Sequence, residues 1–183
     1  MAYNVPSYTT SRLSFGPGIL YIGPVGSTPS VDIGAVKGDA ELTVKRTMLD
    51  VFAGSPLSLI KKYAVKEDIS IKVTGCEWNM NNLMFLLSAG VTTIAGVTET
   101  FEFGGDADTD PYAARYVHRQ PDGSTIDIQL FTVFGKGELA AAFKEKELHE
   151  FPLEFQAVEG TVDFSNVALS SLKKKFKIVR TKA

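Results

Sequence analysis

The side chains that most often bind metals or move protons are few in this sequence and far apart. It contains two histidines, His118 and His149, and one cysteine, Cys76. A zinc site needs three or four converging ligands, and no His-x-His or Cys-x-x-Cys spacing is present. A single cysteine also excludes an intramolecular disulfide. We therefore predict surface histidines, a buried structural thiol, no metal site and no cofactor.

Three alternating aspartates, Asp106, Asp108 and Asp110, match the beginning of a calcium-binding loop. Such a loop needs a glycine at its sixth position and a glutamate at its twelfth. The sequence has neither, and its twelfth position is Val117. These aspartates are expected to form an acidic loop rather than a metal site.

Two short glycine pairs, at residues 16–18 and 135–137, could form turns around a phosphate. Neither continues into a Gly-Lys-Ser/Thr motif or a third glycine at the start of a helix, where phosphate-binding loops lie. A Gly-x-Ser-x-Gly nucleophile elbow is also absent from the sequence. The sequence therefore names no catalytic residue, and we predict a protein that is not an enzyme.

Charge is unevenly distributed along the 183 residues, whose net charge is −2. The last twelve residues hold six cations and no acid, so the preceding 171 hold 13 cations against 21 acids, a net charge of −8. An acidic body argues against tight nucleic-acid binding by the domain itself. The basic end could bind nucleic acid, stay solvated or dock on an acidic neighbour.

The length of the chain is sufficient for one domain with a core of its own. We expect this domain at residues 18–171, after an N-terminal arm at 1–17 and before a basic C-terminal extension at 172–183. No segment approaches the roughly 18 apolar residues of a membrane span, and no leader pattern opens the chain. We expect no membrane binding, and synthesis and assembly in a cytoplasm.

Alternating apolar and polar residues predict at least six antiparallel strands and one helix, a mainly β fold of the α+β type. Strands are expected at residues 18–22, 39–46, 67–75, 98–103, 112–119 and 124–134, with two further strand-like runs at 138–144 and 151–156. Residues 39–46 should pair with 67–75, and the Asp122-Gly123 pair predicts a hairpin between the strands at 112–119 and 124–134. The helix is expected at 79–89, with Asn79 as its N-cap and Gly90 as its left-handed stop.

Residues 48–66, between the first two paired strands, are too long for a tight turn and unusually apolar for a loop. Connections over a domain surface are usually polar. This loop is therefore expected either to meet a partner or to fold back over the edge of its own core. Its candidate contact residues are Val51, Phe52, Pro56, Leu57, Leu59, Ile60 and Tyr63.

With this order of strands, long loop and single helix, the chain resembles the tail tube, or major tail, proteins of long-tailed bacteriophages. The resemblance lies in SFGPGILYIGPVGS at 14–27, in the segment 38–90 that begins GDAELTVKR, and in FGKGELAAAFKEKELHEFPLEFQAVEG at 134–160. It implies two packed antiparallel β-sheets, as a sandwich or half-barrel flanked by the helix. Six subunits would close into a ring around an inner β-barrel, and the loop at 48–66 would reach an adjacent ring.

The same resemblance implies a structural virion protein of the phage tail, assembled in the host cytoplasm. Stacked hexameric rings would form the tube for DNA ejection, with transient and non-specific passage of DNA. Further partners would be the tape measure and terminator proteins, and a sheath if the tail contracts. The basic C-terminal extension matches no familiar element of that family.

A channel for DNA should not attract phosphate strongly, because cationic walls would bind the polyanion and stall it. An acidic body meets that demand. The candidates for the channel wall are solvent-facing residues of the paired strands: Glu41, Thr43, Lys45, Asp68, Ser70, Lys72, Asp127 and Gln129.

Other classes of protein remain open on the sequence alone. One is a tube subunit of a phage-like contractile injection system, and another is a monomeric β-sandwich module that binds, for example, carbohydrate. The module would need exposed aromatic residues on one sheet face, yet Trp78 precedes the expected helix and most phenylalanines fall on expected core faces. An enzyme would need a pocket with a perturbed acid or base, and the sequence names none.

Overall fold

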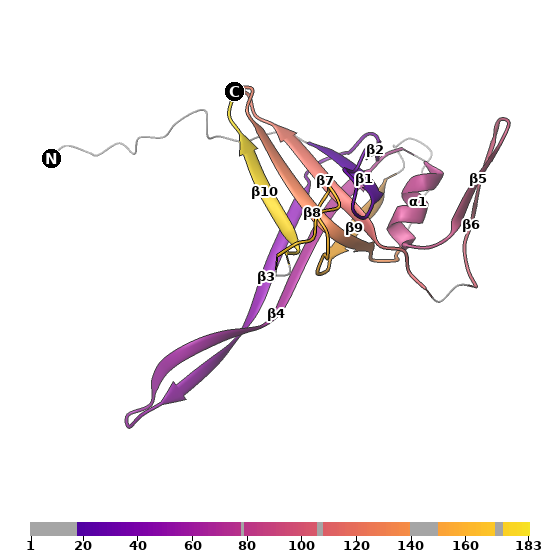
Figure 1. Cartoon of the computed structure of the whole chain (residues 1–183). Helices are drawn as coiled ribbons and strands as arrows, with labels where there is room; N and C mark the ends of the chain where they lie inside the picture. Colours follow the sequence, from indigo (N-terminus) through magenta and orange to yellow (C-terminus); the bar gives the residue numbers. More distant parts are fainter. Residues whose placement is uncertain (1–17, 78, 106–107, 140–149, 171–173) are drawn as a thin grey trace.

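The computed structural model describes residues 18–77, 79–105, 108–139, 150–170 and 174–183 (Figure 1). Within them, antiparallel strands dominate and one short helix is present, so the expected mainly β fold with a single helix is confirmed. The elements are β1 (Ile19–Pro24), β2 (Val31–Asp32), β3 (Glu41–Ala53), β4 (Ser58–Gly75), α1 (Met80–Leu87), β5 (Val91–Ala95), β6 (Thr98–Glu102), β7 (Tyr112–Arg119), β8 (Thr125–Gly135), β9 (Phe151–Ala157) and β10 (Phe176–Thr181).

Eight of these strands form one sheet in the order β2-β1-β7-β8-β9-β4-β3, and β10 pairs with β8 outside this order. The expectation of two packed sheets is wrong in this respect. Strand β9 hydrogen-bonds to both β8 and β4, which joins the two halves into one sheet. The second sheet is only the hairpin β5–β6.

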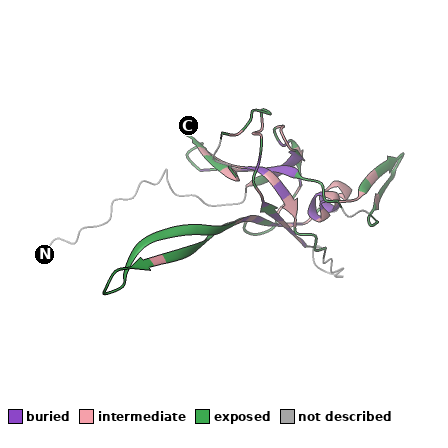
Figure 2. Ribbon diagram, turned by 60° about the horizontal axis from the view of Figure 1, so that its bottom comes forward, coloured by how far each residue is buried: buried purple, intermediate pink, exposed green. Residues whose placement is uncertain are grey.

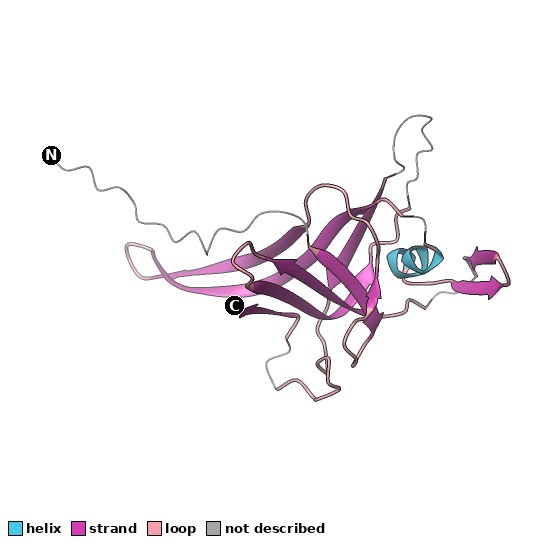
Figure 3. Cartoon of the chain, turned by 90° about the horizontal axis from the view of Figure 1, so that it is seen from above, coloured by secondary structure: helices cyan, strands magenta, loops and turns pink. Residues whose placement is uncertain are grey.

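The large sheet curls, so that its two end strands, β2 and β3, come near each other; these two strands also follow one another in the chain (Figures 1 and 3). The stretch between them binds the end of β4. The Lys37 amide donates to the Thr74 carbonyl oxygen at 2.8 Å, and the Cys76 amide donates to the Ala35 carbonyl oxygen at 2.9 Å. One short segment thus holds the two ends of the sheet near each other.

The core lies on the concave side of this sheet, where alternate residues of each strand are apolar. It includes Leu20 and Ile22 of β1, Ile71 and Val73 of β4, and Phe155 of β9, all almost fully buried. Burial of each such side chain is worth about 1.5 to 3 kcal/mol. The core residues on β4 and β9 are those that the alternating pattern placed on one face.

Helix α1 closes one end of the core. Phe85 packs edge-on against Tyr112 of β7, with ring centroids 4.9 Å apart. The helix also lies directly on the end of β8, since a Cβ atom on Gly135 would come within 1.9 Å of the Leu86 carbonyl oxygen. Only glycine fits at this contact.

The N-terminus of α1 lies where the sequence predicted it, and the C-terminus does not. At its start, the Asn79 side chain accepts a hydrogen bond from the Asn81 amide at 2.9 Å, as expected of an N-cap. Its end lies earlier than expected, at Leu87, because Ser88 adopts the left-handed conformation with φ 49°. The Ser88 hydroxyl also accepts a hydrogen bond from the Gly135 amide at 2.6 Å.

The expected strand pairs 39–46 with 67–75 and 112–119 with 124–134 are confirmed, and the second run of the late segment forms β9. The first late run, 138–144, lies mostly outside the described residues. Strands β2, β5 and β10 were not expected from the sequence. Strand β10 comes from the basic C-terminal segment and lies end to end with β9 along one edge of β8.

Candidate functional site

The hairpin of β3 and β4 extends far beyond the body of the molecule (Figure 1). Strand β9 pairs with β4 only from Ile69 onward, so residues 44–68 form a two-stranded projection, called here the projecting hairpin. The expected loop at 48–66 is therefore wrong. Both strands run through it, and only four residues, 54–57, connect them.

Two β-bulges lie in β4. The register shifts between Thr47 and Met48, where β4 has the extra residue Val65, and again between Val51 and Phe52, where it has the extra residue Ile60. A β-bulge moves the following side chains of the bulged strand to its other face. Strand β3 has no extra residue, and its alternating pattern was lost at Met48 because apolar residues then occupy both of its faces.

Exposed apolar side chains occupy both faces of the projecting hairpin. Residues directly opposite each other in an antiparallel pair point to the same side. Phe52, which pairs with Leu59, lies on the face that Leu42 and Val44 occupy nearer the core, whereas Leu49 and its partner Tyr63 lie on the other face. The exposed apolar residues of the two strands are Val44, Met48, Leu49, Phe52, Leu59, Ile60, Tyr63 and Val65 (Figure 2).

Six of the seven expected contact residues are exposed, and Val51 is half-buried. Phe52 has 55% of its surface exposed and Leu57, in the turn, 75%. The hairpin does not fold back over the core. Sequence reasoning missed four exposed apolar residues at the base and middle of the hairpin: Val44, Met48, Leu49 and Val65.

Charged side chains lie among the exposed apolar residues of the projecting hairpin. Lys62 pairs with Asp50 at 3.0 Å, and Arg46 pairs with Glu67 at 2.8 Å. The Lys61 ammonium lies 4.6 Å from the centre of the Tyr63 ring. Exposed pairs of this kind contribute at most about 1 kcal/mol each. They help order the hairpin but leave its apolar side chains in water.

The opposite face of the same strands is polar and forms an open groove of about 520 Å³. Six of the eight expected channel-wall residues line this groove: Glu41, Thr43, Lys45, Asp68, Ser70 and Lys72. Glu154 and Gln156 of β9 join them. Lys66 pairs with Asp68 at 2.9 Å and Lys136 with Glu154 at 2.5 Å. Cations and acids therefore alternate here, and the acidic balance of the chain is not carried by this face.

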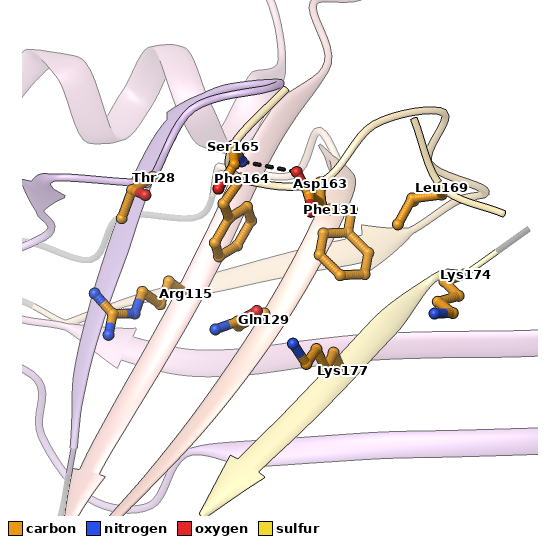
Figure 4. Close-up of a pocket in the computed structure, with 10 residues that line it drawn as sticks. All are labelled: Thr28, Arg115, Gln129, Phe131, Asp163, Phe164, Ser165, Leu169, Lys174 and Lys177. Carbon is orange, nitrogen blue, oxygen red and sulfur yellow. Dashed lines mark hydrogen bonds between the residues drawn. The ribbon is translucent and has the colours of Figure 1, made fainter. Parts of the chain in front are cut away.

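The other two expected channel-wall residues, Asp127 and Gln129, lie apart from this groove in a second hollow of about 480 Å³ or at its edge. Figure 4 shows the loop with Asp163, Phe164 and Ser165 over the strands that carry Arg115, Gln129 and Lys177. Both Asp127 oxygens accept hydrogen bonds from Arg115 at 2.9 to 3.1 Å, and these bonds raise the pKa of Arg115.

The carboxylate of Asp163 orders the loop that carries Asp163, Phe164 and Ser165. Asp163 accepts hydrogen bonds from the backbone amides of Ser165 at 2.8 Å and Val167 at 3.0 Å. These amides lower the pKa of Asp163. Phe164 packs on Phe131 of β8, with ring centroids 5.5 Å apart, so the loop covers part of the polar side of the sheet.

The histidine and aspartate expectations are tested only in part. His118 is 6% exposed, so its placement on the surface was wrong: it follows Ala114 and Tyr116 on the core side of β7. His149 and Asp106 lie outside the described residues. Cys76 is half-buried directly after β4. In the part of the chain that the structure describes, no three His, Cys, Asp or Glu side chains are placed to hold a metal ion.

The projecting hairpin and the polar groove are two surfaces, within the described residues, that a macromolecular partner could cover. Comparison of the sequence with protein-family models and with curated proteins gives no significant match. In the described residues, no helix has the length and apolarity needed to cross a membrane. The functional interpretation therefore depends on the geometry of these surfaces.

Proposed function

We propose that this chain is a structural subunit of a bacteriophage tail tube, which assembles into stacked hexameric rings around a conduit for DNA. The main support is the projecting hairpin, which carries exposed apolar side chains on both of its faces into solvent. Monomeric proteins rarely keep a large apolar surface in water. A second copy, in an adjacent ring, would cover it.

The free strand edges support closure into a ring. Among the strands that the structure describes, β3 is 13 residues long and pairs on one side only, with β4. Within the same residues, β10 pairs only with β8, and the outer half of β4 pairs only with β3. Such edges accept strands from other chains, and closure into a barrel removes them. Six curled sheets joined at these edges would form the inner wall of the tube.

The polar groove suits the lining of that wall. Its lysines and carboxylates alternate, and two of the lysines are already paired with acids. Paired lysines release few counterions when DNA approaches, so the wall would hold phosphate weakly. The subunit would belong to the virion tail, where the tape measure, terminator and any sheath protein are its further partners.

The first test of this function is the assembly state of the purified protein. Light scattering and negative-stain electron microscopy should show rings or tubes with a central channel. A protein that stays monomeric at concentrations well above micromolar would contradict the proposal.

A further inference from the structure

A second hairpin, β5–β6, projects from the body on the side opposite the projecting hairpin (Figures 1 and 3). Its two strands pair only with each other, and α1 is its main neighbour in the described structure. Its exposed apolar residues are Val91, Ile94, Val97 and Phe103, with Val97 in the turn and fully exposed. A two-stranded hairpin of this size is only marginally stable in water by itself.

The surface around β5–β6 is acidic. The sequence has no lysine or arginine between Lys72 and Arg115. Glu102 and two aspartates, Asp108 and Asp110, line a hollow of about 580 Å³ beside Val91 and Phe103. Glu99 lies on β6 opposite Ile94. The apolar side chains of this hairpin are thus surrounded by carboxylates.

The outer half of the projecting hairpin has the opposite charge. Residues 47–66 contain three lysines, Lys61, Lys62 and Lys66, against one acid, Asp50. Lys61 lies beside Tyr63, on one of the two faces that carry exposed apolar residues. The chain therefore has one apolar surface with basic flanks and, on its other side, one apolar surface with acidic flanks.

We infer that the projecting hairpin of one copy docks on the β5–β6 hairpin of another copy. This inference rests on the proposed function, because it names the surface that receives the hairpin. The two apolar surfaces exclude water from each other, while the lysines meet the carboxylates at the rim. Because the two surfaces differ and lie on opposite sides, the contact repeats from copy to copy and builds rings or tubes rather than a closed dimer. Contact between two projecting hairpins would instead bring lysines together.

A charge-reversal experiment tests this pairing. One variant carries Lys61→Glu and Lys62→Glu, and the other carries Glu99→Lys and Glu102→Lys. Each variant alone places like charges across the contact, and the concentration needed for assembly should rise by about tenfold or more. An equimolar mixture pairs the acidic hairpin of the first variant with the basic hairpin of the second. The mixture should therefore assemble where neither variant does, and high salt should weaken this rescue.

The outcomes separate this inference from the function itself. Normal assembly of the Glu99→Lys/Glu102→Lys variant, or no rescue in the mixture, would overturn the docking site while tubes of the unchanged protein still supported the function. Val97→Asp provides a second test, because this fully exposed turn residue can be replaced without loss of folding. It should block assembly, whereas Val167→Asp, on the exposed loop over β8, should not. Equal assembly by both single variants would also refute the docking site.

Discussion

Replacing Phe52 and Leu57 by aspartate should block stacking of the subunits while leaving the subunit folded. The two side chains are 55% and 75% exposed, so most of their apolar surface is still available for burial in a contact. Full burial of a Phe or Leu side chain is worth about 1.5 to 3 kcal/mol, which leaves about 2 to 4 kcal/mol for the two together. At about 1.4 kcal/mol per factor of ten, their loss weakens each contact by about 25- to 700-fold. The unpaired aspartates add a desolvation cost.

The assay for this double variant compares the concentration at which light scattering rises and the length of tubes in electron micrographs. Thermal unfolding followed by circular dichroism shows whether the subunit is intact. The midpoint should change little, because surface substitutions usually change the free energy of unfolding by less than about 0.5 kcal/mol. Val167→Asp is the matched control, since it places the same charge on an exposed valine away from both hairpins. Unchanged tube length and threshold concentration in the double variant would refute the role of the hairpin.

Three further predictions concern the fold. Gly135→Ala should lower the free energy of unfolding by about 2 kcal/mol or more, because its Cβ atom would overlap the Leu86 carbonyl group; an unchanged denaturant midpoint would contradict this contact. Asp163→Asn should lower the melting temperature at pH 7, and this loss should shrink as the pH is lowered below about 3.9, because the amide hydrogen bonds lower the pKa of the folded-state carboxyl. The stabilisation that they provide is present above its unfolded pKa of about 3.9 and is lost as the pH falls through the folded value, so a loss that is unchanged down to the lowest pH at which the protein folds would argue against this explanation. A chain that ends at Lys175 lacks β10 and should unfold at lower temperature than the full chain, whereas equal melting temperatures would show that β10 adds nothing to the sheet.

Local patterns predicted the strands and turns that depend on neighbouring residues. The hairpin β7–β8 follows from alternation and from the Asp122-Gly123 turn, where Gly123 has φ 82°. The start of α1 follows from Asn79, whose side chain caps the helix in the structure. In these elements the residues that determine the conformation lie within a few positions of each other.

Features that depend on distant contacts were not predictable in the same way. Apolar residues on both faces of β3 and two bulges in β4 concealed the projecting hairpin as an apolar loop. Strand β10 is short, and its position is determined by the open half of the β8 edge rather than by its own sequence. The union of the two halves of the sheet depends on β9, which bonds on one side to β8, the preceding strand, and on the other side to β4, far away in the chain.

The same limits apply to the candidate site. Six of the expected channel-wall residues share one groove, because a two-residue period places them on one side of a single hairpin. Asp127 and Gln129 are separated from them because they lie on the half of β8 that pairs with β10, whereas the groove lies on β3, β4 and β9. The alternation of one strand gives its faces but not which strands become its neighbours.

Strand β4 is a single stretch of 18 residues, one half anchored between β3 and β9 and the other half in solvent. At about 3.3 Å per residue it is about 60 Å long, about three times the usual length of a strand. A load applied at the turn of the hairpin therefore travels along one continuous main chain, through the bulges at Ile60 and Val65, to Ile71 and Val73. In a stacked tube, such a strand would act as a rod that transmits bending or tension from one ring directly into the interior of the next.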